Sequence, residues 1–362
     1  MERIRWTIVL IKSKSMPPVF YSCPRDIESY NAVEPAENLK EEMGWKLVHG
    51  DVFRAPAHPL WFSVLIGTGV QVSAMAGATM VIALLGLLSP ANRGSFVTTL
   101  LLWFVFMGIP GGYTSARLYK LFHGTAWKQA TLSTALCYPS LLFAIFFITN
   151  GMLWHQGSSQ AVPFGTLFAL LVLWFGISVP LVFVGAYFGY KAKTLDTSVR
   201  TNQIPRHLPT ATRQHPVRTV SVWLLIGIFP FSVVWIELFF IMSALWMHQI
   251  YYVFGFLFIV LAMMLITTAE CTIVLTYVTL CREDYRWWWP SFLSAGSTAL
   301  YLLAYAAFYF VAKLDITSVV SSLLYAGYMS MIALTVFFLT GTCGFVASFC
   351  FVQKIYGSIK ID

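Results

Sequence analysis

Two carboxylates inside long apolar runs are the side chains best placed to do chemistry in this sequence. Glu237 and Glu270 are the only acidic residues in such runs, and an ionisable group at membrane depth is costly unless it is paired or functional. Helical spacing of about 1.5 Å per residue puts them roughly 16 Å apart in depth, so direct contact is not expected. The sequence favours a structural, hydrogen-bonded role and leaves a proton or ion relay and a substrate contact open.

The other polar residues form no catalytic or metal-binding pattern. The sequence lacks a Walker loop, a dinucleotide-binding glycine motif, a zinc-protease HExxH and a serine-hydrolase elbow. Its histidines have no second ligand at metal spacing, and none of its six cysteines forms a CxxC pair. We therefore expect no enzyme activity, no catalytic residue, no metal and no cofactor.

Two short patterns fit the edges of a membrane. The run Tyr285-Arg286-Trp287-Trp288-Trp289 stands where a polar loop re-enters an apolar stretch, and amphipathic rings beside a cation are typical of an interfacial anchor. The chain ends in Lys360-Ile361-Asp362, which places an ammonium beside the Asp362 carboxylate and the terminal carboxyl. That arrangement suits recognition by a coat-protein surface.

The composition around these residues is typical of a membrane protein. The chain of 362 residues is 58% hydrophobic and 10% charged, with a mean hydropathy of +0.72, whereas soluble domains carry roughly 25% charged residues. The net charge of +8 is spread over short loops, which favours a role in membrane orientation over nucleic-acid binding. We expect the lipid bilayer as a partner and no nucleic acid.

Eight apolar stretches exceed the roughly 20 residues that a helix needs to cross a bilayer. The sequence therefore predicts an all-α polytopic integral membrane protein, with an eight-helix transmembrane bundle over residues 59–353. An N-terminal segment, 1–58, precedes the bundle, and a tail, 354–362, follows it. The expected spans lie near 60–88, 96–116, 130–153, 164–190, 220–246, 250–280, 288–312 and 318–352.

Basic residues in the loops predict the orientation of this bundle. The loops at 117–129, 191–219 and 281–287, together with the tail, carry 13 Lys and Arg residues. The loops on the opposite side carry two, Arg93 and Lys313. Because cytosolic loops are the basic ones, both the N-terminal segment and the C-terminal tail are expected in the cytosol.

Several stretches resemble the transmembrane 9 superfamily, the nonaspanins or EMP-type endomembrane proteins. They are residues 44–54, 115–120 and 283–289 and, in the tail, 354–356 and 360–362. The resemblance runs from about Arg25 to the C-terminus, so residues 1–24 fall outside it. The family's cleaved signal, lumenal domain and first span do not precede residues 44–54 here, which accounts for eight expected spans rather than nine. Pro290 also stands where the family usually has a basic residue.

The resemblance implies residence in the Golgi and endosomes and a role in sorting other membrane proteins, particularly those with Gly-rich transmembrane helices. It also implies that Lys360 and Asp362 form a Golgi-retention signal read by the COPI coat. The alternative function is a secondary transporter or channel with Glu237 and Glu270 on its conduction path. A third option is a scaffold for partner subunits.

Overall fold

The computed structural model describes residues 44–86, 93–158, 161–206, 216–246, 250–313 and 318–358. Side chains within these ranges are described except at 93–96, 216–219, 236–246, 250–254 and 313. Every regular element in the described part of the chain is helical. The predicted fold class, an all-α polytopic membrane bundle, is confirmed.

The described helices follow one another along the chain, with the longest connection between Lys191 and Pro216. They are α3 (Gly44–Leu47), α4 (Pro59–Leu84), α5 (Arg93–Phe106), α6 (Gly108–Leu121), α7 (Trp127–His155), α8 (Phe164–Leu173), the π-helix η1 (Trp174–Ser178), α9 (Val179–Lys191), α10 (Pro216–Trp246), α11 (Ile250–Cys281), α12 (Trp288–Gly296), α13 (Thr298–Lys313) and α14 (Val319–Ser358).

Seven helical segments in the described ranges are long and apolar enough to cross a membrane, and they lie over the first four and the last three expected spans. The fifth expected span, 220–246, lies in α10, of which the described apolar part, Val220–Trp235, is shorter. The count of eight therefore stays a prediction. The cytosolic position of the termini does too, because both chain ends lie outside the described residues.

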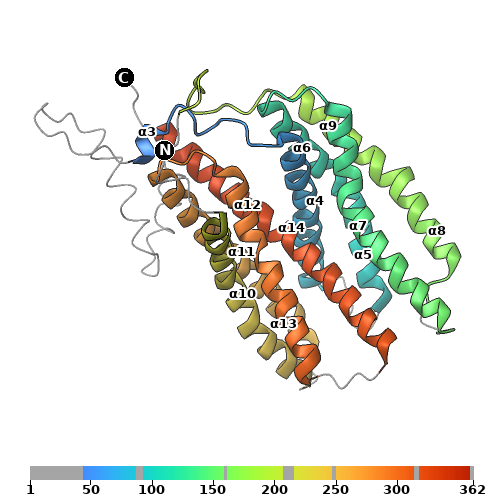
Figure 1. The fold of residues 1–362 in the computed structure, drawn as a ribbon. Coiled ribbons are helices and arrows are strands. Elements are labelled where there is room, and N and C mark those ends of the chain that lie inside the picture. Colours follow the sequence, from blue (N-terminus) through green and yellow to red (C-terminus); the bar gives the residue numbers. More distant parts are fainter. Residues whose placement is uncertain are drawn as a thin grey trace, which may run out of the picture.

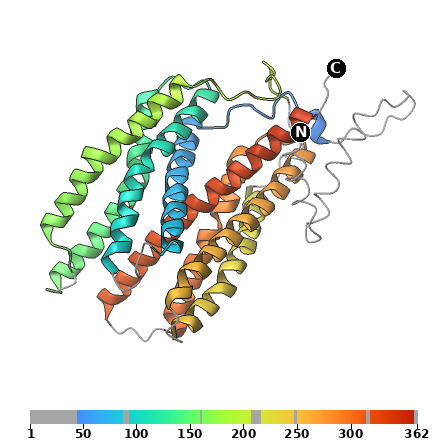
Figure 2. The same ribbon diagram turned by 180° about the vertical axis from the view of Figure 1, so that it is seen from behind.

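Two groups of helices flank the long helix α14 (Figure 1, Figure 2). The helices from α4 to α9 lie on one side of it and those from α10 to α13 on the other. It contacts α4 and α7 in the first group and α11, α12 and α13 in the second. Helix α11 also reaches across, to α4. Because α14 contacts several helices of both groups, it is the main structural link between them.

A change of helix type marks the fourth span. Pro180 stands at the start of α9, directly after the π-helical turn η1. Proline has no backbone N–H, and its ring clashes with the carbonyl four residues earlier in a regular α-helix. The wider π turn removes that clash, so the span continues across the proline.

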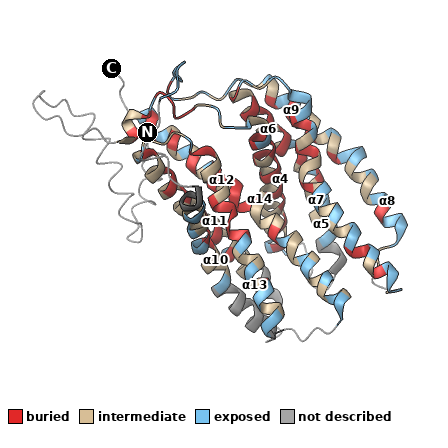
Figure 3. Cartoon of the chain, in the orientation of Figure 1, coloured by how far each residue is buried: buried red, intermediate tan, exposed pale blue. Residues whose placement is uncertain are grey.

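Burial is concentrated at one end of the bundle and along its middle. Buried residues gather on α4, α6 and α12 and on the second half of α14, whereas α8 is mostly exposed (Figure 3). One apolar cluster, which includes Trp45, Phe62 and Trp287, lies at the end where α4 and α12 begin. A second cluster, which includes Val72, Tyr138 and Phe338, links α4, α7, α11 and α14.

Candidate functional site

The predicted intramembrane carboxylates are placed only in part. Glu270 lies on α11 and is half-buried, and it makes no hydrogen bond or ion pair with the described residues. Glu237 lies on α10, but its side chain falls outside the described residues, so the expected separation of the two carboxylates stays a prediction. Lys360 and Asp362 also lie outside the described part of the chain.

The tryptophan run is built into contacts with the rest of the protein. Trp287 and Trp288 are 0% and 1% exposed, while Trp289 is half-buried and Tyr285 and Arg286 precede them in the loop before α12. Trp287 donates its indole N–H to the Val52 carbonyl at 2.8 Å, and Trp289 donates to the Ala57 carbonyl at 2.7 Å. These bonds tie the segment before α4 to the start of α12. A role of the run as a membrane anchor stays a prediction.

Aromatic rings continue this contact into the bundle. Phe62 on α4 meets the rings of Trp288, Trp289 and Phe345 edge-on, with centroids 6.0, 5.2 and 5.1 Å apart. Trp288 also stacks on Trp287 at 4.3 Å. Such pairs contribute about 0.5–1.5 kcal/mol each beyond the area that they bury. The cluster therefore fixes α4, α12 and α14 relative to one another.

Charged residues cross-link the segments outside the long helices at this end, the first of which includes the short helix α3. We term these segments the cap: residues 44–57, 192–206 and 282–287. Asp51, which is 3% exposed, accepts hydrogen bonds from Nε of Arg54 at 2.9 Å and from the backbone N–H of Arg206 at 3.1 Å. Arg206 in turn donates to the Leu47 carbonyl and to Glu283, both at 2.8 Å. Hydrogen bonds with a charged partner are roughly twice as strong as neutral ones, so the cap is held by its charges.

The end of α14 is attached to the same cap. Tyr356, 1% exposed, donates its hydroxyl to the Trp45 carbonyl at 2.7 Å. Ser198 donates to the Gln353 carbonyl at 3.0 Å. The helix that precedes the tail is therefore held by two segments distant in sequence.

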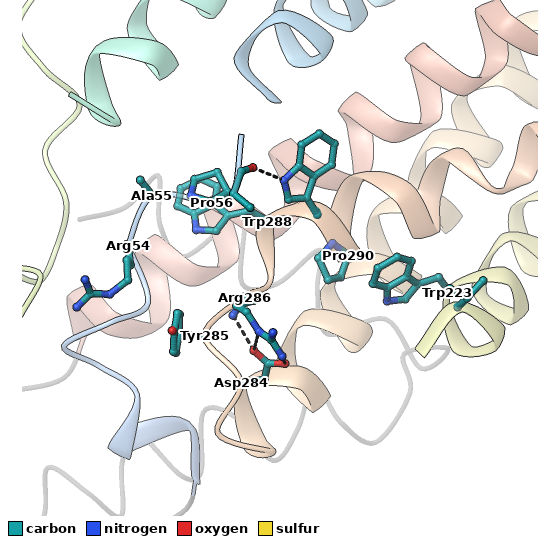
Figure 4. A pocket seen from close by; sticks show the side chains of 12 residues that line it. Arg54, Ala55, Pro56, Trp223, Asp284, Tyr285, Arg286, Trp288 and Pro290 are labelled. Carbon is teal, nitrogen blue, oxygen red and sulfur yellow. Dashed lines mark hydrogen bonds and ion pairs between the residues drawn. The ribbon is translucent and has the colours of Figure 1, made fainter. Parts of the chain in front are cut away.

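A pocket of about 560 Å³ opens between the cap and the starts of α10 and α12 (Figure 4). Within it, Arg286 holds Asp284 through two hydrogen bonds, from Nε and Nη2, both 3.0 Å long. These bonds raise the pKa of the Arg286 guanidinium. The volume of the pocket lies in the range of about 300–1,000 Å³ typical of small-molecule sites. The lining residues are Arg54, Ala55, Pro56, Ala57, Val220, Trp223, Asp284, Tyr285, Arg286, Trp288, Trp289 and Pro290.

The described lining of the pocket combines charged side chains with aromatic rings. Its described lining residues include no serine, cysteine, histidine or lysine, and the one carboxylate among them, Asp284, is engaged by Arg286. Among the described residues, no group of three His, Cys, Asp or Glu side chains lies close enough to hold a metal ion. Guanidinium groups beside aromatic faces suit an anion attached to an apolar body.

A family model and several curated relatives match most of the chain. The family model described as Endomembrane protein 70 matches residues 8–319. The chain belongs to the endomembrane protein 70 family. This confirms the resemblance to the transmembrane 9 superfamily that the sequence motifs indicated.

Relatives of this endomembrane protein 70 chain occur in plants and animals. It is 55% identical over 339 residues to transmembrane 9 superfamily member 9 of Arabidopsis thaliana, covering 93% of this chain and 52% of that protein. It is 49% identical over 338 residues to member 4 of Homo sapiens, covering 93% and 52%. The chain thus spans about half the length of the curated relatives that it matches. No solved structure matches it.

The stretches that carry the family resemblance meet in or beside the cap. Residues 44–54 contact 283–289 through Val52 and Trp287, and they contact 354–356 through Trp45 and Tyr356. In the stretch 115–120, Lys120 donates to the carbonyls of Tyr190 and Ala192 at the end of α9, both at 2.8 Å. The sequence shows the tryptophan run but not its partners, the carbonyls of Val52 and Ala57. Contacts between segments that are separated by most of the bundle give no local signal.

Proposed function

We propose that this protein acts, without catalysis, in the sorting and trafficking of other membrane proteins in the Golgi and endosomes. The observation that carries the proposal is its membership of the endomembrane protein 70 family together with the ending Lys360-Ile361-Asp362. The pocket, whose groups suit binding rather than bond-making, agrees with a role that involves no chemistry on a substrate.

Gly-rich transmembrane helices of client proteins are the proposed cargo. Small residues let helix backbones approach closely in lipid, where van der Waals packing drives association. The chain packs its own helices in this way, because a Cβ added at Gly112 would lie 2.2 Å from the Val182 carbonyl oxygen. Exposed small positions also exist on its outer surface: a Cβ at Gly165 or Gly176, on α8 and η1, would meet nothing within 4 Å. These positions leave room for a client helix.

The tail is the proposed contact with the COPI coat. Helix α14 ends at Ser358, so Lys360 and Asp362 follow it within four residues. An ammonium beside two carboxylates offers a fixed pattern of charges to a complementary protein surface. The bundle would hold the client, and the tail would pass the complex to the coat.

Alanine substitution of both Lys360 and Asp362 tests the coat signal. The chain carries an internal tag, because an extension of the C-terminus would mask the signal. We expect the unchanged chain to reside in the Golgi and to co-precipitate coatomer, and the double variant to do neither. Lys354→Ala is the matched control, since Lys354 is an exposed basic residue of the same tail outside the signal. Equal distribution of the unchanged chain and the double variant would contradict the proposal.

Transport is the second candidate function, with Glu237 and Glu270 on the conduction path. It is favoured by Glu270, a half-buried carboxylate within a span that makes no hydrogen bond or ion pair among the described residues. Carboxylates inside membranes frequently mark ion and proton paths. Ion flux into proteoliposomes that is lost in Glu237→Gln and Glu270→Gln would support transport. Absence of flux together with altered surface levels of client proteins would support sorting.

A further inference from the structure

The pocket lies where three helices start. The candidate spans Pro59–Leu84 and Trp288–Ala312 and the shorter apolar helical segment Val220–Trp235 begin beside it, and its lining includes Ala57, Val220 and Trp288. Span ends mark the boundary between hydrocarbon and water. The pocket is therefore at the depth of the lipid headgroups, with the cap on its aqueous side.

The charges of the lining favour an anion. The lining contains two guanidinium groups, of Arg54 and Arg286, and one carboxylate, Asp284, while the carboxylate that pairs with Arg54, Asp51, lies outside the lining. Arg54 uses Nε and Nη2 for Asp51 and the Asn202 carbonyl, and Arg286 uses Nε and Nη2 for Asp284. Nη1 of either arginine makes no hydrogen bond within the described part of the chain. Both side chains are held in place and still have donors for a phosphate.

The start of α12 offers further donors without a partner among the described residues. Trp287 caps this nine-residue helix without a side-chain hydrogen bond, which leaves the N–H groups of Trp288 and Trp289 uncapped, while Pro290 has no N–H. Such a terminus attracts negative charge. The indole N–H of Trp288 is buried and has no acceptor among the described residues. An unmet buried donor costs about 1–3 kcal/mol, which a polar ligand group can relieve.

The rest of the lining is apolar and aromatic. In Figure 4, Trp223 and Pro290 lie toward one end of the pocket and Arg54 toward the other, with Tyr285 and Arg286 between them. On α10, Val220 is 46% exposed and lies one helical turn from Trp223, so the two side chains form an apolar wall of the pocket. A phosphate at one end and an apolar surface at the other match the two parts of a phospholipid.

We propose that this pocket binds the phosphate-bearing headgroup of an anionic phospholipid from the adjacent leaflet. Basic pockets between transmembrane helices are established sites for such headgroups in membrane proteins. The phosphate contacts Arg54, Arg286 and the start of α12, and the acyl chains lie along α10. Binding of the lipid joins the segment 54–57 to the 284–290 segment, because both supply lining residues.

The test measures lipid binding to the full chain in detergent micelles by native mass spectrometry and titration. The probes are dioctanoyl phosphatidylinositol phosphate, dioctanoyl phosphatidylcholine and inorganic phosphate. We expect the unchanged chain to prefer the anionic lipid. Arg286→Gln removes one charge-assisted contact at an exposed side chain and weakens binding about tenfold or more. Arg282→Gln, in the same loop but outside the lining, is the matched control and retains the affinity.

A second variant changes shape without changing charge. Val220→Trp places a large ring in the pocket and should abolish binding even if Arg286→Gln disturbs the loop. Unaltered binding to both variants would overturn the proposal. If inorganic phosphate competes for the pocket as effectively as the anionic lipid does, the proposal is overturned as well, because the site would then hold a free anion. Equal binding of phosphatidylcholine would exclude a preference for anionic headgroups.

Discussion

Close packing of α6 against α9 gives the sharpest test of the fold. A Cβ added at Gly185 would lie 2.1 Å from the carbonyl oxygen of Ile109 and 2.8 Å from its carbonyl carbon. Both atoms belong to the backbone of a helix, so no side-chain rotation relieves the overlap. In Gly185→Ala the helices must separate by about 1 Å to restore ordinary contact distances.

The expected cost of this variant combines two opposing effects. Overpacking of a tight interface costs about 1–3 kcal/mol, while alanine is better than glycine inside a helix by roughly 0.5–1 kcal/mol. The two ranges leave a net loss of up to about 2.5 kcal/mol in the free energy of unfolding, and their midpoints give a loss of about 1 kcal/mol. The assay is the thermal unfolding midpoint of the purified chain in detergent, with the monodisperse fraction as a second reading.

Gly151→Ala is the matched control, because Gly151 is exposed on α7 and an added Cβ meets nothing within 4 Å. This variant should unfold at the same temperature as the unchanged chain or slightly above it. If Gly185→Ala is as stable as the unchanged chain, the inferred approach of α6 and α9 is wrong. If both variants lose stability equally, the loss does not arise from helix contact.

Two further predictions concern the cap. Trp287→Phe keeps a ring but leaves the Val52 carbonyl without its donor, and should lower the free energy of unfolding by about 1–3 kcal/mol in the same assay. Tyr356→Phe removes the bond to the Trp45 carbonyl and should speed amide hydrogen exchange at residues 355–358, the end of α14. Tyr328→Phe, at a 50% exposed position of the same helix, should leave that exchange unchanged. Equal exchange in all three chains would show that Tyr356 does not hold the helix end.

Local sequence signals are sufficient to predict the helices. Each apolar stretch is long enough to cross a bilayer, and in lipid a backbone without internal hydrogen bonds is too costly, so a helix follows from length and composition alone. The same signals do not resolve changes within a helix. The expected span 96–116 is divided at Met107 into α5 and α6, and the last helix continues to Ser358 rather than ending near 352.

The pocket and the cap could not be predicted in this way, because their contacts join distant parts of the chain. Trp287 and Val52 are 235 residues apart in sequence, and Tyr356 and Trp45 are 311 apart. Hydrophobic periodicity carries no information on such pairs. The tryptophan run was interpreted from its place at the membrane edge, which is a local property, whereas the burial of Trp287 depends on a segment that precedes the bundle.

The contacts of the cap also account for the stretches that resemble the family. Residues 44–54 supply one side of the contacts whose other sides come from 283–289 and 354–356. Substituting one side alone leaves a buried donor or acceptor unpaired, at a cost of about 1–3 kcal/mol. The resemblance in these stretches is therefore accounted for by folding of the cap. The sorting proposal is tested at Lys360 and Asp362, which lie outside the described residues, and on the outer helix surfaces, where substitution leaves the packed contacts of the cap intact.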